Sequence, residues 1–136
     1  MTGRRAGATT PWMRLAPWIA VLVGGTIGTG ARTAIDLALL DAHPWQTLGI
    51  NVVGALALGL LVARAWPVAP AWLQAGLGTG LLGGFTTFSA LALAVAQQPS
   101  AMTLAYLAAS IVLGVAAAWA GLRLGSRDAP RQGADA

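Results

Sequence analysis

The chain has 136 residues, of which 57% are hydrophobic and only 9% are charged, a composition typical of integral membrane proteins rather than soluble domains. It contains no cysteine, which excludes disulfides, thiolate metal sites and cysteine nucleophiles. The net charge of +4 comes from arginines at the ends of apolar segments and in the tails, which indicates lipid-headgroup contacts rather than nucleic acid.

Four apolar stretches are each near or above the about 20 residues needed to span a bilayer. They cover residues 15–40, 45–66, 70–96 and 101–124. The turns between them, each containing a proline, lie at 41–44, 67–70 and 97–100. The sequence therefore predicts one all-α membrane domain of four helices over residues 15–124, with an N-terminal tail over 1–14 and a polar, disordered C-terminal tail over 125–136.

The arginines are distributed unequally along these spans. An even number of spans places both ends of the chain on one side of the membrane, and that side would carry Arg4, Arg5, Arg14, Arg64, Arg123, Arg127 and Arg131. The opposite side has only Arg32, with Asp36, Asp41 and His43 nearby. Because positive charge is retained in the cytoplasm, both termini are predicted on the cytoplasmic side of the inner (plasma) membrane.

Small residues recur at helical-neighbour spacing in three of the spans. The positions are Gly24 and Gly28, then Gly76, Gly80 and Gly84, then Ser110, Gly114 and Ala118. Such faces let helix backbones approach closely, although glycine is also common in membrane helices without any function. Because four short helices enclose little of a pathway alone, the pattern predicts a tightly packed oligomer.

Polar side chains at membrane depth form i, i+4 pairs on the first, second and fourth spans. The pairs are Arg32 with Asp36, Thr47 with Asn51, and Tyr106 with Ser110. Hydroxyls can bond back to their own helix, and Arg32 can simply pair with Asp36 at the interface. The Asn51 amide cannot be satisfied on its own helix, so it is expected to bind a substrate or another helix.

The third span contains a polar interruption at residues 83–89, Gly-Gly-Phe-Thr-Thr-Phe-Ser. Irregular backbone inside a bilayer is tolerated only where protein buries it or where it lines a polar cavity. We therefore expect the third helix to be broken in mid-membrane. Hydroxyls, an amide and aromatic ring edges all present positive dipoles, which suits a small anion, although water or a neutral solute would also fit.

Two other function classes are weaker. A small four-helix multidrug or cation exporter requires a membrane-embedded carboxylate, yet the chain has no glutamate and Asp36 lies near the end of its span. An enzyme is not expected, since there is one histidine, His43, and no nucleophile–base pair or metal set. A subunit that only packs against others would leave the interruption at 83–89 unexplained.

Three motifs, in order and spacing, resemble the fluoride channels called Fluc or CrcB. They are Gly24-Gly25-x-x-Gly28-x-x-x-Arg32, Thr47-Leu48-x-x-Asn51-x-x-Gly54, and the heptad at 83–89. The resemblance covers about residues 20–115 and includes the pair Tyr106 and Ser110. It implies a passive, fluoride-specific channel that lowers cytoplasmic fluoride, built as an antiparallel, dual-topology dimer with two pores along the interface.

The resemblance also implies roles for individual residues. The fluoride pore would be lined by Asn51, Phe88, Ser89, Tyr106, Ser110 and Thr47. The backbone carbonyls of Gly83 and Thr86 would hold one structural Na⁺ at the dimer centre, and Arg32 would be structural or form a vestibule.

The sequence departs from the family pattern in two ways. The family's Phe-Ser-Thr-Phe run is Phe88-Ser89-Ala90-Leu91 here, so Leu91 replaces the second pore phenylalanine. Secondly, dual-topology homodimers require a weak charge bias, whereas the arginine distribution favours one orientation. Both a homodimer and a heterodimer with a homologous chain of opposite orientation therefore stay open, and we favour testing the heterodimer first.

Overall fold

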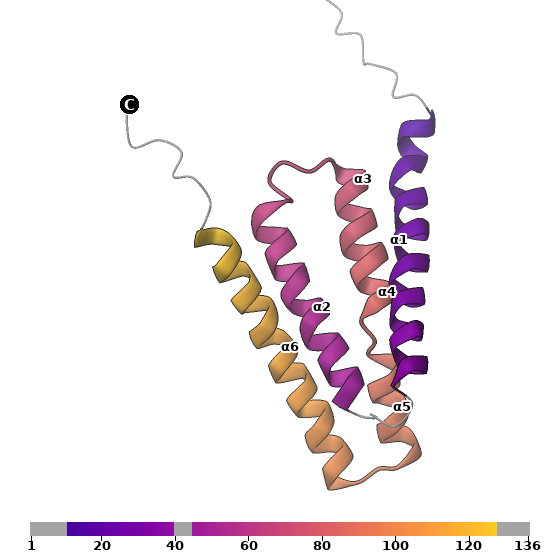
Figure 1. The fold of residues 1–136 in the computed structure, drawn as a ribbon, viewed down its shortest axis with the longest axis vertical. Helices are drawn as coiled ribbons and strands as arrows, with labels where there is room; N and C mark the ends of the chain where they lie inside the picture. Colours follow the sequence, from indigo (N-terminus) through magenta and orange to yellow (C-terminus); the bar gives the residue numbers. More distant parts are fainter. Residues whose placement is uncertain (1–10, 40–44, 128–136) are drawn as a thin grey trace, which may run out of the picture.

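The computed structural model describes residues 11–39 and 45–127, which are almost entirely helical (Figure 1). The elements are α1 (Pro11–Ala38), α2 (Trp45–Arg64), α3 (Ala71–Gln74), η1 (Ala75–Leu82), α4 (Gly83–Phe85), α5 (Ser89–Gln97) and α6 (Ala101–Arg127). Four helical stretches are long and apolar enough to cross a membrane, at Arg14–Ala38, Trp45–Arg64, Ala71–Gln97 and Ala101–Ser126. The prediction of four spans is thus confirmed by length and composition.

Two helix ends extend beyond the predicted limits. α1 begins at Pro11, since proline is well accommodated in the first turn of a helix, where its missing N–H is not needed. α6 continues to Arg127, three residues beyond the predicted end of the fourth span, and Gly125 lies close to Leu60 and Ala63 of α2. Residues 1–10, 40–44 and 128–136, including His43 and most of both tails, lie outside the described residues.

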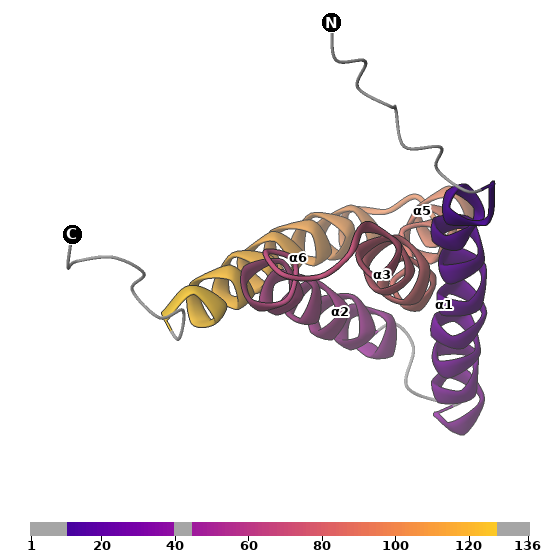
Figure 2. The same cartoon turned by 90° about the horizontal axis from the view of Figure 1, so that it is seen from above.

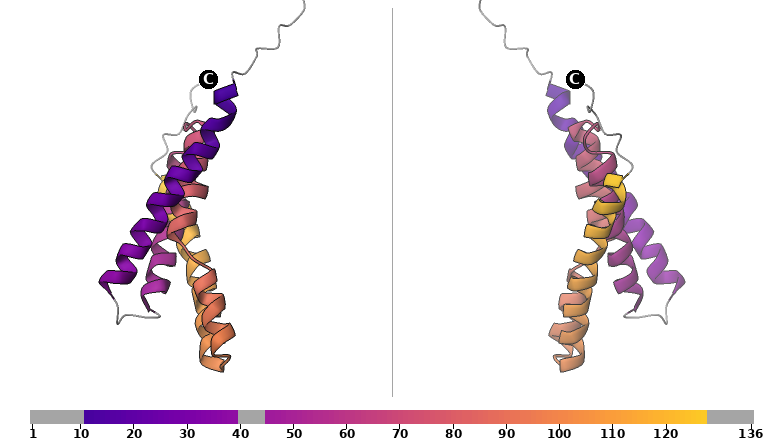
Figure 3. Two further views of the ribbon diagram at one scale, coloured as in Figure 1. Left: turned by 90° about the vertical axis from the view of Figure 1, so that its right-hand side faces the viewer. Right: turned by 90° about the vertical axis from the view of Figure 1, so that its left-hand side faces the viewer.

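The helices pack as two pairs. α2 runs along α6, while α1 runs along η1 and α4 (Figures 1 and 2). The start of α1 and the end of α6 lie at the same end of the molecule, as four passes require (Figure 1). At the opposite end α1 and α2 diverge from α5 and the start of α6, which gives the molecule a wedge-shaped profile (Figure 3).

Glycines make the seam between α1 and η1. A Cβ atom on Gly24 would collide with the carbonyl oxygen of Gly76, and one on Gly28 with that of Leu81. The close approach predicted from the glycine spacing is therefore present, within the chain itself. Gly114 differs, because nothing lies within 4 Å of a Cβ built there.

The third span is broken, as predicted. η1 is a π-helix, a wide helical form that often occurs at functional sites. After the short α4, Thr86 is extended, with φ −79° and ψ 156°, and the chain becomes helical again at Ser89. Among the described residues few apolar side chains are buried in the single chain, namely Ile50, Leu82 and Leu91. Many large ones face outward, as expected of a protein surrounded by lipid.

Candidate functional site

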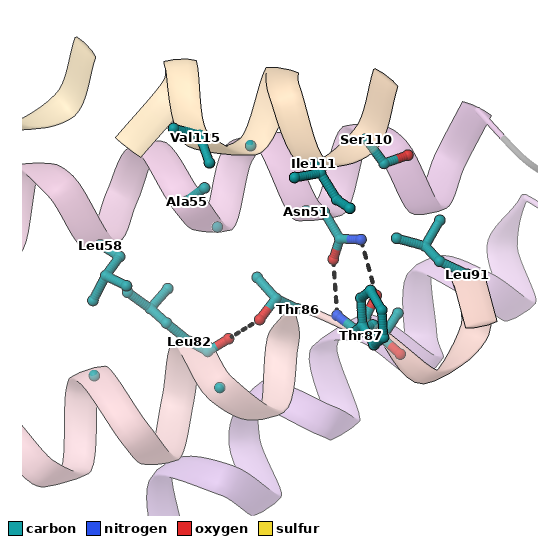
Figure 4. A pocket seen from close by; sticks show the side chains of 15 residues that line it. Asn51, Ala55, Leu58, Leu82, Thr86, Thr87, Leu91, Ser110, Ile111 and Val115 are labelled. Atoms are coloured by element: carbon teal, nitrogen blue, oxygen red, sulfur yellow. Dashed lines mark hydrogen bonds between the residues drawn. The ribbon is translucent and has the colours of Figure 1, made fainter. Parts of the chain in front are cut away.

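The side chain of Asn51 joins α2 to the break in the third span. Its Oδ1 accepts a hydrogen bond from the Thr87 N–H at 2.8 Å, and its Nδ2 donates to the Thr87 carbonyl at 2.9 Å (Figure 4). The amide thus satisfies both backbone groups of one residue that has left the helical ladder. This is the partner on another helix that the sequence predicted Asn51 would require.

Hydroxyl groups satisfy further backbone groups at the break. Thr86 Oγ1 donates to the Leu82 carbonyl at 2.9 Å, the back-bonding alternative considered for isolated hydroxyls. Thr87 Oγ1 accepts from the Ala90 N–H at 3.3 Å and lies 3.1 Å from Ser89 Oγ. The polar residues of the heptad therefore hold the broken helix in one conformation.

A cavity of about 400 Å³ lies beside the break. Asn51 from α2, Thr86 and Thr87 from the break, and Ser110 from α6 surround it together with apolar side chains (Figure 4). Phe88 also lines it and is 63% exposed in the single chain. Three helices thus bring an amide, hydroxyls and an aromatic ring to one cavity that opens on the surface of the subunit.

A second cavity, of about 440 Å³, lies toward the end of α1. It is lined by Arg32, Asp36, Thr47 and Tyr106 among others. Arg32 pairs with Asp36 at 3.4 Å, and Gln46 Nε2 donates to the other carboxylate oxygen at 2.6 Å. The predicted i, i+4 pairing of Arg32 and Asp36 is therefore present, beside this second cavity.

Leu91 and Thr87 are the two residues that line both cavities. Leu91 is only 4% exposed, and the equally apolar Ile50, 6% exposed, also lines the second cavity. Leu91, together with Thr87, therefore forms the partition between the two cavities.

The predicted pore residues fall into three groups. Asn51, Phe88 and Ser110 share the first cavity, whereas Thr47 and Tyr106 share the second. Ser89 lines neither cavity and is exposed beside Thr87. Ser110 Oγ donates to the carbonyl of Tyr106 at 2.8 Å, so its hydroxyl bonds back to its own helix in this structure.

Two residues that line or bond within these sites, Gln46 and Ile50, were not predicted from the sequence. Gln46 precedes the Thr47/Asn51 pair and reaches Asp36 on another helix, but a glutamine at a span end gives no signal of its own. Ile50 has no signal beyond apolarity, since burial between two cavities depends on packing. Gly83 and Thr86, predicted to offer carbonyls, both line the first cavity.

The described residues contain no group of three or more His, Cys, Asp or Glu side chains that could hold a metal ion. A cation at this site would therefore depend on backbone or neutral side-chain oxygens.

Comparison with known proteins identifies relatives of the whole membrane domain. The family model described as CrcB-like protein, Camphor Resistance (CrcB), matches residues 19–122. A protein of Rhodospirillum centenum named fluoride-specific ion channel FluC is 43% identical over 117 residues, covering 78% of this chain and 92% of the relative. One of Chelativorans sp., with the same name, is 44% identical over 115 residues, covering 76% and 91%. In Halalkalibacterium halodurans, fluoride-specific ion channel FluC 2 is 39% identical over 120 residues, covering 84% and 89%.

Proposed function

The chain belongs to the CrcB-like family, and from this membership and the geometry of its site we propose that it is a fluoride channel. It lets fluoride leave the cytoplasm passively and so lowers the concentration and toxicity of fluoride in the cell. It is a transport protein rather than an enzyme. The alternative of a small multidrug or cation exporter gains no support from these relatives.

The observation that carries the proposal is the convergence of Asn51, Phe88 and Ser110 on the cavity beside the break. Fluoride is small and strongly hydrated, so a dry pore must replace its water with donors along the path. An amide N–H and the positive edge of a phenyl ring supply such interactions without a fixed charge that would trap the ion.

A second chain completes the pathway in this proposal. The first cavity opens on the surface of the single subunit, where Phe88 and Ser89 are exposed. Polar groups that face lipid lack hydrogen-bond partners, which costs free energy. Burial against another protein chain that supplies partners removes this cost. An antiparallel partner would supply the opposite wall, consistent with the family resemblance.

The orientation of this partner follows from charge. Arg14 lies near the start of α1, Arg64 ends α2, and Arg123 lies near the end of α6, whereas Arg32 lies in the last third of α1. The start of α1 and the end of α6 lie at the same end of the molecule (Figure 1). This bias favours cytoplasmic termini in the inner membrane and one fixed orientation. The antiparallel partner is then a homologous chain that inserts the other way, whereas a homodimer requires this chain to insert in both orientations.

A structural Na⁺ at the dimer centre also belongs to the proposal. The extended Thr86 interrupts the helical ladder next to the first cavity, which Gly83 and Thr86 both line. Backbone carbonyls at a broken membrane helix suit a hard monovalent cation. They would provide neutral oxygen ligands where the described residues provide no cluster of acidic side chains.

The test of the channel is fluoride efflux from liposomes that contain the purified chain, with chloride-loaded liposomes as the control. We expect fluoride efflux well above that of protein-free liposomes and little chloride efflux. No fluoride efflux, either from the chain alone or from the chain co-expressed with a homologue of opposite charge bias, would overturn the proposed function.

A further inference from the structure

We propose that Asn51 and Thr87 are positioning residues for the cation. Their side chains hold the two backbone amides that a continuous helix would direct at the carbonyls of Gly83 and Thr86. This inference rests on the proposed cation site and deepens it, because it assigns side chains to a site that otherwise consists of backbone alone.

The first amide is that of Thr87. In an α-helix each N–H bonds to the carbonyl four residues earlier, so the Thr87 N–H would bond to Gly83. It donates instead to Asn51 Oδ1 at 2.8 Å. Because Thr86 is extended, with ψ 156°, the Thr87 N–H no longer points along the helix axis toward the Gly83 carbonyl. Asn51 thereby replaces the Gly83 carbonyl as the acceptor, and the carbonyl is released from its helical partner.

The second amide is that of Ala90, whose helical acceptor would be the carbonyl of Thr86. It donates instead to Thr87 Oγ1 at 3.3 Å. A side-chain oxygen again takes the place of a backbone carbonyl, in the manner of a helix N-cap. The two released carbonyls are those that the family resemblance implies would bind Na⁺.

Asn51 also connects the cation site to the anion path. One of its two Nδ2 hydrogens is used by the Thr87 carbonyl, at 2.9 Å, while the side chain lines the first cavity (Figure 4). The second N–H is therefore available to an anion, because the first fixes the plane of the amide. One side chain would then hold the cation ligands in place and donate to fluoride.

The experiment measures thermal unfolding of the assembled, purified protein as a function of Na⁺ concentration, with N-methylglucamine replacing Na⁺ at constant ionic strength. The wild-type midpoint should rise with Na⁺. Thr87→Ser keeps the hydroxyl and should retain the wild-type half-maximal Na⁺ concentration. Thr87→Val is nearly isosteric but removes the acceptor of the Ala90 N–H, and should need about tenfold more Na⁺.

A second pair of variants separates the two roles of Asn51. Asn51→Asp keeps an oxygen that can accept the Thr87 N–H, so the Na⁺ response should persist while fluoride efflux falls sharply, because a negative charge enters the anion path. Asn51→Leu removes acceptor and donor together, so both the Na⁺ response and fluoride efflux should be lost.

Unchanged half-maximal Na⁺ concentrations in Thr87→Val and Asn51→Leu, with only a lower midpoint in the absence of Na⁺, would overturn the positioning role. A wild-type protein that conducts fluoride but does not respond to Na⁺ would overturn the cation site and this inference, and leave the channel standing. A wild-type protein that responds to Na⁺ without conducting fluoride would overturn the proposed channel function. The positioning role would then still be tested by the half-maximal Na⁺ concentrations of Thr87→Val and Asn51→Leu.

Discussion

Phe88 exposes 63% of its surface in the single chain and lies beside the break, where it lines the first cavity. Phe88→Ile keeps an apolar side chain but removes the aromatic ring, whose edge would face the anion in the proposed channel. Fluoride efflux from liposomes should fall about tenfold or more, the change expected from a barrier raised by roughly 1.4 kcal/mol. Leu93→Ile on α5, at a residue that is 56% exposed, is the matched control. Unchanged efflux in Phe88→Ile would exclude this ring from the pathway.

Leu91 occupies the position where the family resemblance expects a second pore phenylalanine, and it is 4% exposed between the two cavities. Leu91→Ala should open the partition, because the truncated side chain leaves a void that joins the two cavities. The expected result is a higher ratio of chloride to fluoride efflux, measured in parallel liposome assays. Leu93→Ala on the exposed face of the same helix is the control, and equal ratios in both variants would count against the partition.

For individual residues, the sequence predicted a chemical role more readily than a partner or a degree of burial. An intramembrane amide must find partners, so a tertiary role for Asn51 followed from its chemistry. Its partner is 36 residues away in sequence, and no periodicity relates Asn51 to Thr87. The burial of Leu91 between two cavities likewise depends on how helices pack, which the apolar character of leucine does not reveal.

At the scale of helices, the seam between α1 and η1 depends on the missing side chain of Gly28. Gly28→Ala places a Cβ on the carbonyl oxygen of Leu81, a backbone atom that cannot move without shifting η1. The free energy of unfolding should fall by about 1–3 kcal/mol, observed as a lower thermal midpoint in detergent.

Gly30→Ala, on the same helix, is the control for this seam, since nothing lies within 4 Å of a Cβ at Gly30. That variant should be neutral or slightly more stable, because alanine favours helix over glycine by up to about 1 kcal/mol. Equal destabilisation of Gly28→Ala and Gly30→Ala would show that helix propensity or lipid contact, rather than packing on η1, sets the stability of α1.

The elements themselves were largely predictable, since four apolar stretches separated by prolines leave few alternatives in a bilayer. The break in the third span followed from the hydroxyl residues at 83–89, and the structure places it at Thr86. The π-helical form of η1 was not predictable. Its eight residues, Ala-Gly-Leu-Gly-Thr-Gly-Leu-Leu, are too short and too uniformly small or apolar to distinguish one helical period from another.

For the whole molecule, orientation can be measured directly because the natural chain contains no cysteine. Ser126→Cys lies near the end of α6, and Met102→Cys, at a residue that is 78% exposed, lies near its start. If the arginine bias fixes the insertion, a membrane-impermeant thiol reagent added to intact cells should label Met102→Cys and not Ser126→Cys.

Equal labelling of both variants would contradict a fixed orientation and favour a homodimer whose two copies insert in opposite directions. Labelling of Met102→Cys alone, combined with efflux only on co-expression of a homologue, would establish the two-chain assembly.

The glycine seam also bears on how ions could be gated. Where α1 meets η1 and α4, the contact surfaces are backbone atoms of Gly24, Gly28, Gly76 and Gly80, which have no rotamers to exchange. A seam of this kind cannot rearrange by side-chain flips, and moving it would separate whole helices. The third span is thereby held firmly against α1, so in the proposed channel the rate of fluoride efflux should rise only shallowly with temperature, as in diffusion rather than protein rearrangement.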